Sequence, residues 1–267
     1  LVMGQNAPAK GVSESVETPL SQEKAQECYD ALQSVQRAIK SKNHLSVQQL
    51  FTPDGWEIFE DMVKNGTPTI IREPELTFTQ VDNEIVCRSV PMSFKFPRSG
   101  KTIVENVEFR MNSTDLKIKS VAFMLNQEAE ADIMNPDKNW DDRSRRQIVE
   151  FLQNYQTAYS LKRTDYLESI FSEDALIIVG TKLKQAPKLE NQIRPTNLEQ
   201  YKYTKATKEQ YINALRRVFA SAEFVNLQLK DNEILKSGTG EEIYGIQIRQ
   251  LYASNSYADE GYLFLVV

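Results

Sequence analysis

The chain has 267 residues, of which 40% are hydrophobic and 26% are charged, and its net charge at pH 7 is -5. This composition is typical of a globular protein, and the length suits two domains, because single hydrophobic cores commonly close at roughly 100 to 150 residues. The acidic balance argues against nucleic acid as the main partner, and no apolar run approaches the roughly 18 residues that a membrane span requires.

Residues 1–20 are polar, contain Gly and Pro and show no periodicity, so we expect a flexible leader there. Its first residues, LVMGQNA, have the pattern of the end of a signal-peptide apolar core followed by small residues. We therefore expect export to the periplasm or the cell surface. The alternative is a frayed terminus without a targeting role.

A helix is predicted over residues 22–42, with Ser21 as its N-cap. Its apolar positions recur at helical spacing and comprise Cys28, Leu32, Val35 and Ile39. A second short helix should follow through Val47, Leu50 and Phe51, and the turn formers TPDG, residues 52–55, should end it.

The segment GWEIFEDMVKNG could form a third helix, and four β-like runs follow it with turn residues between them. The runs are Thr69 to Gln80, Glu84 to Phe96, Thr102 to Asn112 and Leu116 to Asn126. Because they are sequential and closely joined, they predict an antiparallel meander with one face on the helices. Pro91 would interrupt a central strand, so we expect a bulge or bend there.

The second half repeats this opening 120 positions later. Apolar residues Ile148, Leu152, Tyr155 and Tyr159 fall on the four positions of the first helix, and residues 171–174 fall on residues 51–54. A shared spacing over some thirty residues predicts a diverged internal duplication. The expected organisation is one domain over residues 21–129, a linker over 130–142 and a second domain over 143–267.

The second domain should begin with two helices, 143–161 and 164–171, of which Asp141 or Asp142 caps the first. A strand 174–180, an extended segment 181–206 and a helix 207–220 opened by a capping box should follow. Three strands are then predicted over residues 222–236, 242–254 and 260–267. Because the sequence stops within the apolar run GYLFLVV, we expect one further strand beyond Val267 and an unpaired sheet edge without it.

Two segments carry a resemblance to a known family. The stretch NYQTAYSLKRTDYLESIFSEDALIIVG resembles the helix, helix, strand opening of the NTF2-like superfamily, also described as SnoaL-like or cystatin-like cones. The stretch EIYGIQIRQLYASNSYADEGYLFLVV is similar to tandem NTF2-like proteins exported by Bacteroidetes-type bacteria. The resemblance implies an α+β fold of two cones, each with N-terminal helices packed on a curved antiparallel sheet.

Enzymes of this superfamily place a carboxylate, a Tyr or a His inside the cone, so the resemblance directs attention to those residue types. His44 falls in a turn between helices, which lacks the desolvation that tunes a base. Asp174 lies at the corner between a helix and a strand. A structural role, accepting hydrogen bonds from nearby backbone donors, is favoured for it, because proton transfer needs a second positioned group.

Tyrosines are the stronger candidates for lining a pocket, with Gln247 or Arg249 beside them. Tyr155 and Tyr159 occupy a helix face, whereas Tyr244, Tyr252 and Tyr262 occupy late strands. Plain core packing is the alternative. Tyr244 and Arg249 should lie on opposite faces of one strand unless a bulge intervenes. The pocket candidates are therefore Tyr155, Tyr159, Tyr244, Arg249 and Asp174.

No metal site or cofactor is expected, because the sequence has no phosphate-binding Gly-rich loop, CxxC, HExxH or nucleophile elbow. Buried free thiols are expected for Cys28 and Cys87, with one long-range disulfide as the alternative. The segment 181–206 is rich in Lys and could dock an acidic partner, although a solvated loop is the plainer interpretation.

The sequence favours a noncatalytic exported protein whose domains bind a small hydrophobic ligand, or that contacts a protein partner or a second copy through a sheet face. The alternative is an enzyme similar to SnoaL or ketosteroid isomerase, acting on a hydrophobic carbonyl compound in the second domain. The first is favoured because no paired interior carboxylates are evident.

Overall fold

The computed structural model describes residues 17–72, 75–137, 140–182, 201–238 and 243–266. Most of the predicted leader, most of the extended segment 181–206 and Val267 lie outside these ranges. The chain is α+β with antiparallel sheets, as the sequence predicts. Its contacts define two compact units: residues 162–222 form one, and the residues before and after that segment together form the other.

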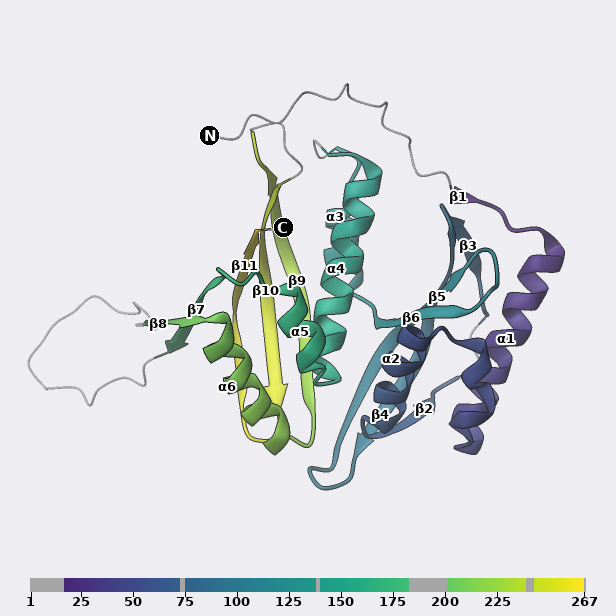
Figure 1. Ribbon diagram of the computed structural model, residues 1–267, viewed down its shortest axis with the longest axis horizontal. Helices are drawn as coiled ribbons and strands as arrows, with labels where there is room; N and C mark the ends of the chain where they lie inside the picture. The colour runs from purple at the N-terminus through teal and green to yellow at the C-terminus, as the bar shows by residue number, and fades with distance from the viewer. Residues whose placement is uncertain (1–16, 73–74, 138–139, 183–200, 239–242, 267) are drawn as a thin grey trace, which may run out of the picture. The chain divides into compact units, whose positions relative to one another are not determined.

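The larger unit contains a six-stranded antiparallel sheet (Figure 1). Its path is β1-β3-β4-β5-β6, and β2 also pairs with β4. The strands are β1 (Glu17–Thr18), β2 (Thr67–Ile70), β3 (Phe78–Val81), β4 (Glu84–Phe96), β5 (Lys101–Asn112) and β6 (Ile118–Phe123). The predicted run from Thr69 to Gln80 is thus divided into two short strands, whereas the other three runs are confirmed.

Pro91 lies in β4 at the point where the strand paired with one side of β4 changes from β3 to β2. The register of β4 against β5 shifts between Cys87 and Val90, and Ser89 takes a left-handed φ of 64°. The Pro91 carbonyl accepts a hydrogen bond from the Ile71 N–H at 3.1 Å. Along this side of β4, β3 pairs only up to Cys87 and β2 begins opposite Met92. The proline, which has no N–H to donate, therefore lies in the gap between the segments of β4 that pair with β3 and with β2. The register shift confirms the predicted bulge.

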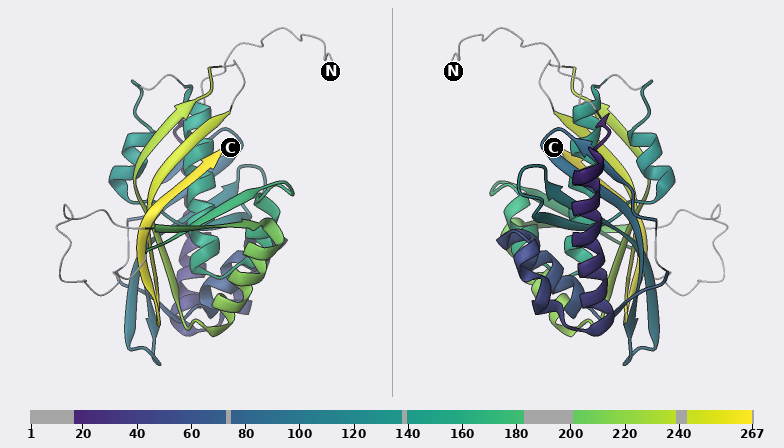
Figure 2. Two further views of the ribbon diagram at one scale, coloured as in Figure 1. Left: turned by 90° about the vertical axis from the view of Figure 1, so that its left-hand side faces the viewer. Right: turned by 90° about the vertical axis from the view of Figure 1, so that its right-hand side faces the viewer.

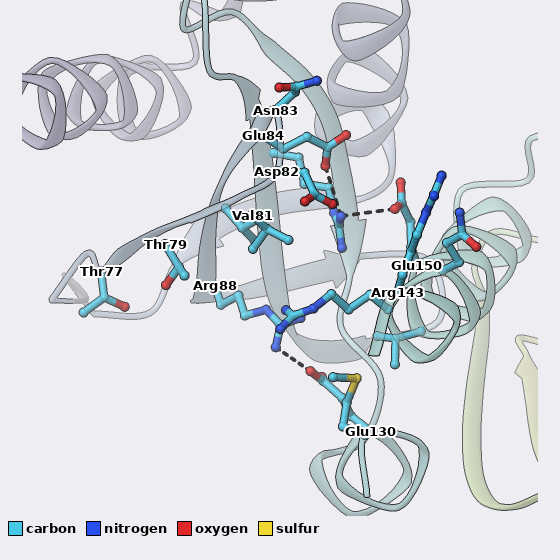
Figure 3. A pocket seen from close by; sticks show the side chains of 16 residues that line it. Thr77, Thr79, Val81, Asp82, Asn83, Glu84, Arg88, Glu130, Arg143 and Glu150 are labelled. Carbon is cyan, nitrogen blue, oxygen red and sulfur yellow. Dashed lines mark hydrogen bonds and ion pairs between the residues drawn. The ribbon is translucent and has the colours of Figure 1, made fainter. Parts of the chain in front are cut away.

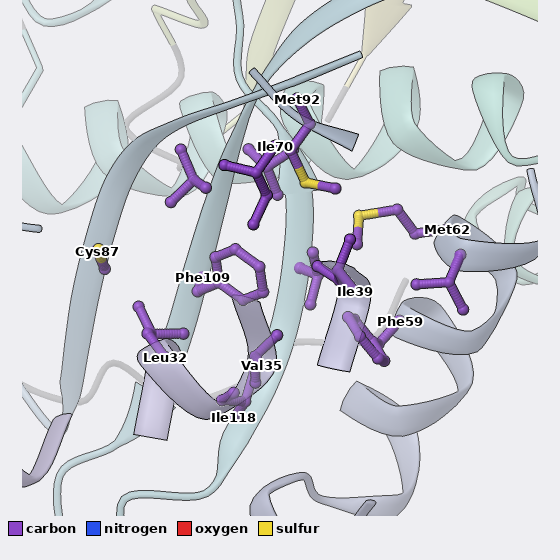
Figure 4. Close-up of a cluster of buried hydrophobic side chains, with 14 of the residues drawn as sticks. Leu32, Val35, Ile39, Phe59, Met62, Ile70, Cys87, Met92, Phe109 and Ile118 are labelled. Atoms are coloured by element: carbon purple, nitrogen blue, oxygen red, sulfur yellow. The ribbon is translucent and has the colours of Figure 1, made fainter. Parts of the chain in front are cut away.

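Three helical segments precede most of this sheet: α1 (Gln22–Ser41), the 3₁₀ helix η1 (His44–Leu50) and α2 (Pro53–Lys64). The helix predicted over 22–42 is confirmed, and Ser21 caps it by accepting from the Lys24 N–H at 3.3 Å. Figure 2, right, shows α1 lying along the sheet, and Figure 4 shows the shared core. Buried residues of the core include Leu32, Val35, Ile39, Phe59, Met62, Met92, Phe109 and Ile118.

The short helix predicted through Phe51 is confirmed as η1, which ends at Leu50 just before TPDG, and the possible third helix is confirmed as α2, which starts within TPDG. Thr52 is the N-cap of α2 and its Oγ1 accepts from the Gly55 N–H at 3.1 Å, while Pro53 occupies the first helical position. Proline fits that position because its missing N–H would have no partner in the first turn. The same residues therefore follow the end of η1 and begin α2.

Gly55 brings α2 close to β6, and we expect Gly55→Ala to destabilise the protein by about 2 kcal/mol. A Cβ atom at this position would lie 2.2 Å from the backbone carbonyl oxygen of Ile118, which cannot move without displacing its strand. Urea unfolding at pH 7 measures the effect. Gly261→Ala is the matched control, because its Cβ would meet no atom within 4 Å. Equal stability of the two variants would contradict the tight packing of α2 on β6.

The larger unit also contains α3 (Gln127–Ile133), α4 (Asp142–Ser160) and a second sheet ordered β11-β10-β9. Its strands are β9 (Val225–Lys236), β10 (Tyr244–Ser254) and β11 (Ala258–Val266). All three match predicted strands, and α4 matches the predicted helix with Asp141 as its N-cap. Among the described strands, β11 pairs with β10 alone and lies at the edge of this sheet.

The buried residues of α4 include several polar ones, and two of these meet sheet edges. The Phe123 N–H of β6 donates to Thr157 Oγ1 at 2.8 Å, and the Leu229 N–H of β9 donates to Gln156 Oε1 at 3.0 Å. Both edge strands thereby obtain partners for backbone groups that burial would leave unpaired. The buried Gln and Thr side chains of α4 thus replace a neighbouring strand.

The smaller unit comprises α5 (Thr164–Ile170), β7 (Leu176–Lys182), β8 (Tyr201–Thr207) and α6 (Lys208–Ser221). The two strands form an antiparallel pair. The predicted capping box of α6 is confirmed: the Gln210 N–H donates to Thr207 Oγ1, and the Thr207 N–H donates to Gln210 Oε1 at 3.1 Å. After α5 the chain turns into strand β7, whereas the matching position of the first half leads into helix α2.

Candidate binding site

Two of the predicted pocket tyrosines are core residues of α4. Tyr155 and Tyr159 are 2% and 3% exposed, and their ring centroids lie 4.8 Å apart. Neither lines the pocket described below. Their position agrees with the alternative that the sequence left open, in which tyrosines at core spacing pack rather than bind.

Tyr244 and Arg249 lie on opposite faces of β10, as alternation predicts. A register shift does occur between Ile248 and Arg249, but the extra residue, Asp231, is on β9, so β10 keeps its alternation. Tyr244 is buried edge-on against Trp140 at 6.0 Å. Arg249 is held by ion pairs to Glu260 at 2.6 Å and Asp231 at 3.1 Å. The structure does not bring the two together.

Asp174 is exposed in a turn of the smaller unit. The local capping role expected of it belongs to its neighbour, because the Asp174 N–H donates to Ser172 Oγ at 3.4 Å. His44 begins η1 and packs edge-on against Phe59 at 6.2 Å between ring centroids. Burial lowers the pKa of His44, so this imidazole is neutral near pH 7. The exposed turn expected for it is in fact partly buried.

Both cysteines are free and fully buried, as expected. Burial raises the pKa of Cys28 to about 11 and that of Cys87 to about 12. The nearby charges of Lys24 and Glu108 change these values less than burial does. Since the thiolate is the reactive form, neither thiol is a nucleophile near neutral pH.

A charged pocket of about 550 Å³ lies in the larger unit, between the β3–β4 hairpin, β5, α3 and the first turns of α4 (Figure 3). We call it the charged pocket. Charged side chains of both signs dominate its lining, which comprises Thr77, Thr79, Val81, Asp82, Asn83, Glu84, Val86, Arg88, Arg110, Glu130, Met134, Arg143, Arg146, Gln147, Val149 and Glu150. None of the five residues predicted from the sequence lines it.

Glu108 of β5 lies beneath the pocket and holds two of its arginines. Its side chain is fully buried. Oε1 accepts from Arg110 Nε at 2.7 Å, and Oε2 lies 2.9 Å from Arg88 Nε in an ion pair without hydrogen-bond alignment. One buried carboxylate thus fixes two guanidinium groups that would otherwise repel each other.

One end of the pocket is a closed network around Arg110. Its Nη1 lies 3.2 Å from both Glu84 Oε2 and Glu150 Oε2, and Lys119 binds the other oxygen of Glu84. Burial alone would lower the pKa of Arg110, but the charges of Glu108, Glu150 and Glu84 raise it. Burial would likewise raise the pKa of Glu84, but Lys119 and Arg110 together lower it. Arg110 and Glu84 therefore stay ionised at neutral pH.

The other end of the pocket contains Arg88, Glu130 and Arg143, and we call it the Arg143 end. Arg88 also pairs with Glu130 of α3, and its side chain is 42% exposed. In Figure 3 the side chains of Arg88 and Arg143 extend toward one another from β4 and α4. Arg143 is exposed and makes no ion pair within the described part of the chain. It is thus a cation with unused hydrogen-bond donors.

Reading the sequence alone missed this pocket because its residues come from distant segments. A local signal was nevertheless present in the run DDRSRR, which places three arginines, Arg143, Arg145 and Arg146, within the first five residues of α4. The positive end of the helix dipole disfavours cations there. A run that contradicts a local rule is a reason to look for a site.

Within the described residues, no group of three or more His, Cys, Asp or Glu side chains could hold a metal ion. No helix in the same ranges is both long enough and apolar enough to cross a bilayer. Comparisons with protein-family models, with curated proteins and with solved structures find no match.

Proposed function

We propose that this chain is a noncatalytic binding protein with two NTF2-like domains, and that the charged pocket is its ligand site. The order of elements supports the fold proposal. In the second half, two helices, a strand pair, a third helix and an antiparallel meander follow in the order expected of an NTF2-like cone. The helices α1 and α4, and likewise η1 and α5, begin 120 residues apart, as a duplication requires. Export remains a proposal that the leader sequence alone supports.

The pairing of the pocket carboxylates is the observation that carries the binding proposal. Glu84, Glu108, Glu130 and Glu150 each form an ion pair with Arg or Lys, so these four carboxylates are engaged in holding the basic side chains of the network. The pocket is still large enough for a small molecule. Its charged lining favours a polar ligand over the hydrophobic compound that the sequence suggested.

A pocket-filling substitution tests the proposal. Native mass spectrometry of the purified chain, incubated with a mixture of small polar metabolites, should detect a bound mass that Thr79→Trp abolishes. Thr79 lines the pocket, whereas Thr102 on β5 is exposed outside it, so Thr102→Trp is the matched control. Retention of every bound mass by Thr79→Trp, with an unchanged melting temperature, would refute the assignment of the pocket.

A further inference from the structure

We propose that the Arg143 end of the charged pocket binds the carboxylate or phosphate group of a small anionic ligand, with Arg143 and Arg88 as the contacting residues. This inference rests on the proposed function and adds the chemical class of the ligand. It follows from three observations on donors, charge and local helix energetics.

The first observation is the supply of unused donors. A guanidinium carries five N–H donors in a planar fork that matches two oxygens of a carboxylate or phosphate. Arg88 commits Nε to Glu108 and Nη1 to Glu130, which leaves Nη2 uncommitted in these contacts. Arg143 has no ion-pair partner in the residues that the structure describes. Both arginines line the pocket, so their spare donors are available to one ligand.

The second observation is the separation of charge along the pocket. Glu84 and Arg88 are four residues apart on β4, which corresponds to roughly 13 Å of strand. Figure 3 places Asp82 beside Glu84, away from Arg143. At the Arg143 end, Glu130 pairs with Arg88 alone, and the second nearby carboxylate, Glu108, is shared between Arg88 and Arg110, so Arg143 has no carboxylate of its own among the described residues. This end therefore carries excess positive charge, which an anion between the two arginines would neutralise.

The third observation is that Arg143 stands in the first turn of α4, where the helix dipole opposes a cation. Arg145 and Arg146 follow at the start of α4 and have structural contacts: Arg145 donates to the Pro136 carbonyl, and Arg146 pairs with Asp142 at 2.8 Å. Arg143 has no comparable contact in the described ranges that would explain its position. We infer that it serves binding.

Isothermal titration of the purified chain with inorganic phosphate and with succinate, at pH 7 and low salt, tests the inference. We expect saturable binding of at least one of these anions, weakened about tenfold by Arg143→Gln, because charge-assisted hydrogen bonds are lost. Arg143→Lys should retain part of the affinity. Arg217→Gln is the control, since Arg217 is exposed on α6 and lies outside the pocket. It should bind like the unmodified chain.

Arg143→Gln should fold, because removing a cation from the first turn of α4 leaves the melting temperature unchanged or raises it. Binding of neither anion, or equal binding to Arg143→Gln, would overturn the inference. A neutral metabolite that is retained by the chain and lost in Thr79→Trp, without any anion binding, would leave the proposed function standing and refute the anionic ligand.

Discussion

Glu108→Gln should destabilise the protein by about 3 kcal/mol, because it removes the negative charge that neutralises Arg88 and Arg110. The Glu108 side chain is fully buried and that of Arg110 is 12% exposed, so water cannot replace the lost partner at Arg110. Arg88 is 42% exposed and can recover part of its hydration, which places the expected cost at the lower end of the range for buried ion pairs. Urea unfolding at pH 7 measures the change.

Glu130→Gln is the matched control, because it removes a carboxylate from the same Arg88. Arg88 is far more exposed than Arg110, so water can replace part of the lost partner. We expect this variant to lose less than about 1 kcal/mol. A Glu108→Gln variant no less stable than Glu130→Gln would mean that the buried carboxylate does not hold the network together.

The network around Glu108 also shows where prediction from the sequence ends. Apart from the pair of Glu108 with Arg110, its ion pairs join residues 20 to 42 positions apart, such as Arg88 to Glu130, and no periodicity within β4, β5 or α3 encodes that register. The sequence predicts that β5 is a strand with one face on the helices. It cannot predict that the other face, with Glu108 and Arg110, lies under a second layer of helices.

Local signals, by contrast, were sufficient for most elements. Ser21, Asp141 and Thr207 were predicted as helix starts from their side chains, and each caps its helix. The TPDG segment follows the end of η1, as predicted, and also begins α2, because Thr, Pro and Asp favour both a turn and the first turn of a helix. The close approach of Gly55 to β6 is a tertiary contact that no local signal predicts.

The burial of polar groups was the other feature that the sequence did not reveal. Gln156 and Thr157 are polar helix residues, yet they are buried, and they complete two strand edges. Glu105 of β5 is a further case. Glu105 is 8% exposed, and its carboxylate accepts a hydrogen bond from Asn226 Nδ2 of β9 at 2.8 Å.

Glu105 gives the larger unit a pH-dependent stability. Burial raises the pKa of its carboxyl from 4.5 to about 7, and the hydrogen bond from Asn226 only partly offsets this. Between these two values the folded chain binds a proton that the unfolded chain has released. This contribution to stability is therefore greatest below pH 4.5 and falls as the pH rises to 7. The carboxylate at pH 8 costs on the order of 3 kcal/mol.

Glu105→Gln removes this titration while keeping an oxygen that can accept from Asn226. We expect the variant to be more stable than the unmodified chain at pH 8, by on the order of 3 kcal/mol, and nearly equal to it at pH 5. The difference between two urea-unfolding series, recorded from pH 5 to 8, isolates Glu105 from all other titrating groups. Glu60→Gln, at a surface pair with Lys64, should show no such trend. If the difference in unfolding free energy between Glu105→Gln and the unmodified chain is the same at every pH, the Glu105 carboxyl is already ionised throughout this range. The contact between β5 and β9 would then not depend on pH.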